Sequence, residues 1–309
     1  LQATQATSRS YPGFTAEEIV QSEIAPDGST VVTIRYARNR HDVTWKTDAK
    51  TIFATTAFRY GEVITAPVPA PEKQGYVLAA WAGLIAGATM PDENLAFSAQ
   101  WQPATDTAYG VRHLREALDG TYSIEDNETL AGTTESLTAA KARSYPGFTA
   151  DPVSQAVIAA DGSTVISITY KRNTYTLNWL AEGVLFKTEQ LKFESAVTIP
   201  GTEPIKKGYH LTGWGDVAKT MPARDISYSA SFAGNSYSVT YDLNGGSGDS
   251  MEISQTFGAP YELPESDPER QGYAFTGWFT TRTAGDRIDS NRLMLTDSDQ
   301  TLYAHWVAG

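Results

Sequence analysis

A seven-residue signature occurs three times in this chain, and no other feature constrains the fold as strongly. Each copy begins with Gly-Tyr and ends with Trp, at 75–81, 208–214 and 272–278. A proline lies four residues before each glycine, and an aromatic residue lies 21 residues before each tryptophan. An aromatic closing segment follows each copy, at 97–101, 228–232 and 302–306. Fixed spacing of this kind predicts an array of small repeated modules.

A second, different repeat lies between the signatures. Residues 9–45 align without a gap on residues 143–179, a shift of 134 positions, and 21 of the 37 aligned pairs are identical. Leu1 then aligns with Glu135. We therefore expect the first copy of this upstream module to be truncated and to lack about two strands that the second copy has.

The complete upstream module is predicted to contain two strands, a helix and two further strands. Residues 109–117 and 122–130 flank the turn Asp119-Gly120, whose glycine can adopt a positive φ. Residues 137–143 are good helix formers behind the N-cap candidate Ser136 and before Tyr145-Pro146-Gly147. Residues 153–158 and 164–170 flank a second Asp-Gly turn. Two hairpins around one helix predict a β-grasp arrangement.

The three signature modules share another pattern. Alternating strands are predicted at 41–45, 175–179 and 237–241, and a second strand ends at each preceding aromatic residue. Within the signature, even spacing places the tyrosine and the leucine or phenylalanine on one face and the tryptophan on the other. The sequence thus predicts an α+β, strand-rich chain of small β-grasp-like (ubiquitin-like) modules arranged as an elongated rod, with boundaries at 1–40, 41–102, 103–173, 174–233 and 234–309.

The signature modules resemble the InlB B-repeat, or Listeria-Bacteroides repeat, family of bacterial surface proteins. The third copy carries the resemblance in Val239–Gly246, Pro268–Trp278 and Thr301–Trp306. The first copy has Ala79-Ala80 where Thr-Gly is usual, and the second closes on Phe232 instead of tryptophan. The upstream modules are similar to the MucBP-like repeats that often alternate with this family. The resemblance implies β-grasp-like domains in long extracellular bacterial proteins, usually anchored to the cell wall, with roles in adhesion or as spacers.

Composition argues against several functions. The net charge of −12 and the pI of about 4.8 argue against nucleic acid and anionic membranes as partners. Without cysteine there is no thiol nucleophile or Cys-based zinc site, and no apolar run approaches the length of a membrane span. Acidic residues fall mostly in turns, so we expect no enzyme activity, no cofactor and no metal. Weak Ca²⁺ binding at 242–250 or 297–299, and Lys–Asn isopeptide cross-links, stay open.

Two hypotheses of function follow. The first is a stalk in a cell-surface adhesin: the chain is expected to be a monomeric rod that projects a binding domain located elsewhere. The alternative is direct binding of a host glycan, mucin or surface protein by the MucBP-like module or a cleft between modules. Tyr122, Tyr175 and Tyr237 are the aromatic residues that such a ligand would contact. Self-association through an unpaired sheet edge in the truncated first module is a further alternative.

Overall fold

The computed structural model describes residues 2–309, which form short strands joined by turns and loops and contain no helix. The chain divides into two compact units. The first unit contains residues up to 115 together with 122–143 and 150–170, and the second contains 116–121, 144–149 and 171–309. The predicted strand-rich character is confirmed, and the helical part of the α+β prediction is wrong.

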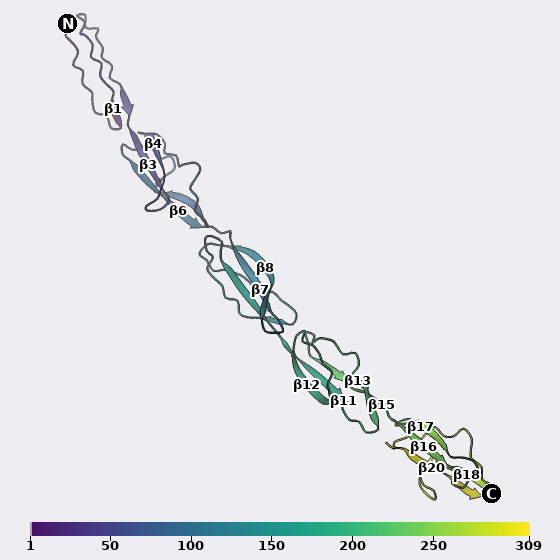
Figure 1. The fold of residues 1–309 in the computed structure, drawn as a ribbon. Coiled ribbons are helices and arrows are strands. Elements are labelled where there is room, and N and C mark those ends of the chain that lie inside the picture. Colours follow the sequence, from purple (N-terminus) through teal and green to yellow (C-terminus); the bar gives the residue numbers. More distant parts are fainter. Residues whose placement is uncertain (1) are drawn as a thin grey trace. The chain divides into compact units, whose positions relative to one another are not determined.

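In the first unit, the signature module forms a four-stranded sheet in the order β4-β3-β6-β5; Figure 1 labels its strands β3, β4 and β6. Its strands are β3 (Arg40–Lys46), β4 (Ile52–Arg59), β5 (Tyr76–Ala82) and β6 (Leu95–Pro103). Strand β3 pairs antiparallel with β4 and parallel with β6, while β5 closes on β6 in the antiparallel sense. The closing strand β6 therefore lies beside the first strand β3, and both strands contribute side chains to the core.

In the second unit, the two other signature modules repeat this connectivity. The first strands β11 and β16 each pair antiparallel with the following strand and parallel with a closing strand. The bounds are β11 (Thr174–Ala181), β12 (Val184–Lys192), β13 (Tyr209–Gly213), β14 (Ile226–Ser229) and β15 (Ser231–Gly234), then β16 (Ser236–Asp242), β17 (Met251–Thr256), β18 (Tyr273–Phe279), β19 (Arg287–Ile288) and β20 (Gln300–Ala308).

Each signature module is built on one buried pair of aromatic rings. The rings meet edge to face, with centroids 4.9, 5.1 and 4.9 Å apart, and all six are at most 6 % exposed. A buried ring of this size removes about 150–250 Å² from water and prefers this T-shaped geometry. The prediction that the repeated tryptophans form cores is confirmed for the pairs Trp45–Trp81, Trp179–Trp214 and Tyr241–Trp278.

The predicted faces of the signature strand are wrong. The register shifts between Leu78 and Ala80, and again between Phe275 and Gly277, so each strand carries a β-bulge before its tryptophan. The extra residue turns the tryptophan onto the same face as the preceding leucine or phenylalanine. Phe275 and Trp278 accordingly both pack on one core. In the usual Thr-Gly-Trp form, Gly277 takes a φ of 130° at this bulge.

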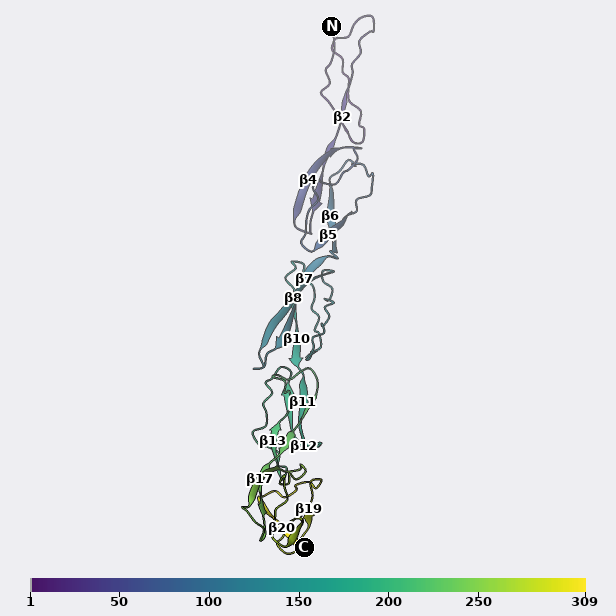
Figure 2. The ribbon, with the colours of Figure 1, turned by 90° about the vertical axis from the view of Figure 1, so that its right-hand side faces the viewer.

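The complete upstream module forms a sheet in the order β8-β7-β10-β9; Figure 2 labels its strands β7, β8 and β10. Its strands are β7 (Thr107–Glu116), β8 (Tyr122–Gly132), β9 (Phe148–Ala150) and β10 (Val165–Arg172). The first predicted hairpin and its Asp-Gly turn are confirmed, with Gly120 at a φ of 84°. Strand β10 pairs parallel with β7. The equivalent strands of the first copy are β1 (Phe14–Ala16) and β2 (Tyr36–Arg38), which pair antiparallel.

The helix predicted at 137–143 is replaced by extended chain. Thr138 and Ala140 are buried while Ala139 is exposed, an alternation of extended backbone. Gln155 fixes this conformation, because its side-chain amide accepts from the Ala140 N–H at 3.1 Å and donates to the Ala140 carbonyl at 2.9 Å. Seven residues are too few to sustain a helix against such competition.

The second predicted hairpin is also wrong. Only Val157 of residues 153–158 makes a β-bridge, and its partner is Leu137 instead of a residue of β10. The pair of hydrogen bonds between Gln155 and Ala140 recurs 134 positions earlier in the sequence. There the Gln21 side-chain amide accepts from the Ala6 N–H at 2.9 Å and donates to the Ala6 carbonyl at 2.8 Å.

Candidate functional site

Three junctions between predicted modules share one set of backbone contacts. At each junction an asparagine follows the last strand of one module and precedes the first strand of the next. Its N–H donates to a glycine carbonyl at 2.8–2.9 Å, and its carbonyl accepts from the N–H of an aromatic residue at 2.8–2.9 Å. We call these sets glycine–aromatic junctions; their glycine, asparagine and aromatic residues are Gly13/Asn39/Tyr60, Gly147/Asn173/Phe193 and Gly208/Asn235/Phe257.

Glycine is required at these junctions for two reasons. Gly13, Gly147 and Gly208 have φ values of 81°, 77° and 79°, a region that other residues rarely adopt. A Cβ atom at any of them would also lie only 2.1–2.6 Å from ring carbons of the aromatic partner. The ring therefore packs directly on glycine backbone.

A second aromatic residue follows each of these glycines. Its ring meets the ring of the aromatic partner edge to face, with centroids 5.9, 5.8 and 5.2 Å apart. At the first two junctions an arginine also donates to the carbonyl of the aromatic partner, at 2.7 Å for Arg38 and 2.9 Å for Arg172. The aromatic partner at each of the first two junctions is therefore held by backbone hydrogen bonds, by ring packing and by an arginine.

A fourth junction keeps the backbone contacts but changes the side chains. Ala104 donates to the Gly75 carbonyl and accepts from the Thr134 N–H, both at 2.9 Å. The Tyr76 hydroxyl donates to the Glu135 carboxylate, which raises the pKa of Tyr76. A Cβ at Gly75 would lie within 2.5–2.7 Å of Ala160. The close glycine contact is therefore common to all four junctions.

Asp92 adds a polar network to the first junction. Its carboxylate accepts from the Gly13 N–H at 3.0 Å and from the Asn39 amide at 2.8 Å, and it lies 2.7 Å from His41 Nε2. The hydrogen bonds from Asn39 and then His41 lower the pKa of Asp92 below its usual value of 3.8. The ionised carboxylate is the form that fits this junction.

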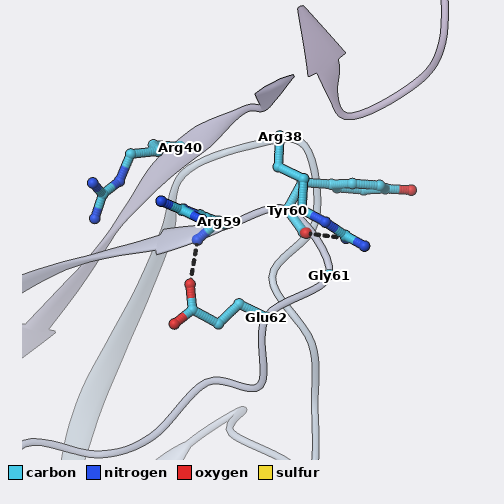
Figure 3. Close-up of a pocket in the computed structure, with 6 residues that line it drawn as sticks. All are labelled: Arg38, Arg40, Arg59, Tyr60, Gly61 and Glu62. Atoms are coloured by element: carbon cyan, nitrogen blue, oxygen red, sulfur yellow. Dashed lines mark hydrogen bonds between the residues drawn. The ribbon is translucent and has the colours of Figure 1, made fainter. Parts of the chain in front are cut away.

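Beside the first junction lies an arginine cleft, defined by Arg38, Arg40, Arg59, Tyr60, Gly61 and Glu62, with a volume of about 370 Å³ (Figure 3). Glu62 accepts from the backbone N–H of Arg59 at 2.7 Å. Within residues 2–309, no hydrogen bond or ion pair engages the guanidinium of Arg40 or Arg59. Three arginine side chains and the carboxylate of Glu62 line this cleft, on a chain with a net charge of −12. Their net positive charge favours an anionic group.

An aromatic groove adjoins the cleft through the shared residue Tyr60. It is lined by Tyr11, Pro12, Phe14, Tyr36 and Tyr60 and has a volume of about 480 Å³. Tyr11 is 46 % exposed and meets Tyr36 edge to face at 4.9 Å. The groove and the cleft together form the candidate site of the first unit.

The three tyrosines predicted as ligand contacts lie in three different sheets. Tyr122, at the start of β8, is 38 % exposed. Tyr175 and Tyr237 occupy equivalent positions on β11 and β16, and each is half-buried against its module core. Each hydroxyl of this pair lies 3.4 Å from the side-chain nitrogen of its junction asparagine. Their role in ligand binding stays a prediction.

Sequence reasoning missed the junction asparagines and a buried methionine in each signature module. Met90, Met221 and Met294 are at most 1 % exposed, and each makes equivalent backbone hydrogen bonds with the two residues that follow the junction aromatic residue of its module. Their spacing from the signature varies, so repetition could not reveal them. The shared Arg-Asn dipeptide at 38–39 and 172–173 was the available signal for the junctions.

Metal binding and membrane spanning were the two other kinds of site considered for the described residues. Residues 2–309 contain no group of three or more His, Cys, Asp or Glu side chains placed to hold a metal ion. Nor does any helix in this range have the length and apolarity needed to cross a membrane.

The repeated strand order, the aromatic cores and the junctions define a tandem-repeat β protein. Residues 41–107 and 237–305 match the model of the Listeria-Bacteroides repeat domain. The chain therefore carries modules of the Listeria-Bacteroides repeat family, as the signature predicted.

Two relatives and one solved structure are similar to parts of the chain. Internalin H of Listeria monocytogenes serovar 1/2a is 31 % identical over 172 residues, which cover 43 % of this chain and 30 % of that protein. A protein of Evansella cellulosilytica with the name "Putative membrane protein" is 28 % identical over 144 residues, 43 % of this chain and 21 % of that protein. The crystal structure of Mub-RV aligns at 12 % identity over 43 % of this chain and 98 % of that one, with a TM-score of 0.16, too low to relate the folds.

The chain spans less than a third of the length of either relative. The family match and the relatives suggest a repeat region of a bacterial surface protein.

Proposed function

We propose that this chain is a non-enzymatic stalk in a bacterial surface adhesin. In this proposal the repeat region extends from the cell, anchored to the wall through another part of the protein, and projects a binding domain. The upstream modules at 1–40 and 103–173 act as MucBP-like spacers between the β-grasp-like signature modules. The chain works as a monomer.

The observation that carries the proposal is the length of the connections at the glycine–aromatic junctions. Strand β2 ends at Arg38 and β3 begins at Arg40, so Asn39 alone connects them. Asn173 and Asn235 likewise stand alone between consecutive strands. Both backbone groups of each asparagine are hydrogen-bonded within the junction. A connection of one residue with no free backbone bond limits bending, which is what a stalk requires.

Small-angle X-ray scattering of the whole chain tests this proposal. A compact protein of this length would have a radius of gyration of about 19 Å. We expect a monomer with a value more than about twice that size. A value close to that of a compact globule would contradict the stalk, whatever ligands the chain binds.

Direct binding of a host glycan, mucin or surface protein is the second proposal. The exposure of Tyr122, the most open of the three predicted tyrosines, favours it because sugars stack on exposed rings. We expect binding of the folded chain to a mucin array to fall when Tyr122 is replaced by alanine. Equal binding by both proteins, or none by either, would count against this role of Tyr122.

A further inference from the structure

A cation lies over the tyrosine ring of the signature in each of the three signature modules. It belongs to the residue two positions before the signature glycine. The charged group lies 3.8, 4.4 and 4.1 Å from the ring centroid in the pairs Lys73–Tyr76, Lys206–Tyr209 and Arg270–Tyr273. In the first two modules the lysine also faces the aromatic residue that ends the closing segment, at 6.0 Å for Trp101 and 5.5 Å for Phe232. Attraction between the cation and the ring faces therefore fixes the charge at the same place in each module.

Two of the three modules cover this cation with a part of their own chain. In the second signature module, Glu182 in the turn between β11 and β12 places its carboxylate 2.7 Å from Lys206 Nζ. In the third, the loop that follows β16 packs on the cation, since a Cβ at Gly245 would lie 3.4 Å from the guanidinium of Arg270. The second module thus shows that a carboxylate fits against the cation and its aromatic neighbours.

In the first signature module the cation is open. The turn between β3 and β4 also carries a carboxylate, that of Asp48, but this group accepts from the backbone N–H groups of Lys50 and Thr51 at 2.8 and 2.9 Å. Within residues 2–309, no hydrogen bond or ion pair engages Lys73 Nζ. A pocket of about 450 Å³ lies beside Lys73 instead.

The lining of this pocket combines apolar and polar side chains. Trp101 and Leu78 supply half-buried apolar surface. The indole N–H of Trp101 donates to the Thr47 carbonyl at 3.0 Å, which fixes the orientation of the ring. Glu72 and Gln74 are exposed and add polar groups that can hydrogen-bond to hydroxyls. An acidic amino-acid side chain would use only the cation, whereas a sugar with a carboxylate would use the cation, the ring and the polar groups.

We propose that this pocket of the first signature module binds an acidic sugar, a pyranose that carries a carboxylate. The carboxylate binds Lys73 in the way that the turn glutamate binds the equivalent lysine of the second module. One face of the sugar ring packs on Trp101, and its hydroxyls bond to the polar side chains of the lining. The inference rests on the second proposed function, glycan binding, and adds a site and a ligand class that do not depend on Tyr122.

Two small sugars that differ only at one carbon, methyl β-glucuronide and methyl β-glucoside, test the pocket in the intact chain. NMR titration would follow the indole N–H of Trp101. We expect a saturable shift with the glucuronide and at least about tenfold weaker binding of the neutral glucoside, because hydrogen bonds to an ionised group are the stronger ones. Lys73→Gln should weaken glucuronide binding at least about tenfold and leave the indole signal of the free chain in place. Lys206→Gln is the matched control, since Lys206 is already paired with Glu182, and it should leave glucuronide binding unchanged.

The outcomes separate this site from the proposed function on which it rests. Equal binding of the two sugars, or equal losses in Lys73→Gln and Lys206→Gln, would overturn the site. Binding of N-acetylglutamate N-methylamide as tight as that of the glucuronide would also overturn it, because the pocket would then be one for acidic peptides. Mucin binding that depends on Tyr122, without any glucuronide binding, would overturn the site and leave glycan binding in place. Glucuronide binding that depends on Lys73, without any mucin binding, would support the site and remove only the role of mucin as its source.

Discussion

Replacing Gly208 by alanine should open the junction at residue 235 much more than the same change at Gly272. The two glycines occupy equivalent signature positions with φ values of 79° and 76°, so alanine meets the same backbone strain at both, about 1–2 kcal/mol. Their surroundings differ. A Cβ at Gly208 would lie 2.6 Å from three ring carbons of Phe257, whereas nothing lies within 4 Å of one at Gly272. Gly272→Ala is therefore a control for the strain alone.

The magnitude follows from that difference. Forcing a methyl group into a packed contact typically costs about 1–3 kcal/mol. A central value of about 2 kcal/mol corresponds to a roughly 30-fold larger opening constant. The expected excess of Gly208→Ala over Gly272→Ala is therefore about 30-fold.

Native-state hydrogen exchange can read this excess in the intact chain. The amides of Tyr209 and Tyr273 make equivalent turn bonds, to Lys206 and Arg270, beside the two glycines. Exchange at Tyr209 should accelerate about 30-fold more in its variant than exchange at Tyr273 does in the control. Hydrogen exchange of the Phe257 amide should become faster in Gly208→Ala and stay unchanged in Gly272→Ala. Equal acceleration at both tyrosines, with Phe257 unchanged, would refute the packing of rings on glycine backbone.

Three further predictions concern the core, the extended segment and pH. Trp179→Ala should destabilise its module by about 3–5 kcal/mol, since Trp179 is fully buried, and chemical denaturation would show its transition at lower denaturant. Gln155→Ala removes the amide that holds residues 138–140 extended and should cost about 1–3 kcal/mol, with faster hydrogen exchange at residues 136–140 and 156–158 as the readout. The pKa of Asp92 is lowered in the folded chain, so its stabilising effect is present above the unfolded value of 3.8 and is lost as the pH falls through the lower folded-state pKa. Asp92→Asn should flatten the dependence of unfolding on pH in that acid range, and an unaltered dependence would argue against the network.

The modules were predictable from the sequence because their cores rest on large residues at fixed positions. The tryptophans and the alternating strands at 41–45, 175–179 and 237–241 specify both the core and the strand periodicity. The bulges were not predictable, because assigning side chains to alternate faces of a strand assumes that the strand is regular. At Gly277 the bulge reverses the face that this count gives to Trp278.

The helix prediction failed for a different reason. Local propensity at residues 137–143 favours a helix, but Gln155 lies beyond the window in which propensity is read and supplies the competing hydrogen bonds. The junctions and the arginine cleft depend on similar long-range contacts. Arg59 and Tyr60 can be assigned to the cleft and the junction only once the fold places Arg38 and Gly13 beside them.

The proposed stalk requires that one-residue connections hold consecutive modules in a fixed relation. The chain has no cysteine, so the exposed positions of Val184 and Met251, on either side of the junction at Asn235, can be changed to cysteine and spin-labelled without competing sites. Double electron–electron resonance would then measure the distance between the two labels. We expect one narrow distance distribution, which Gly208→Ala broadens. A broad distribution in the otherwise unchanged chain would contradict the claim.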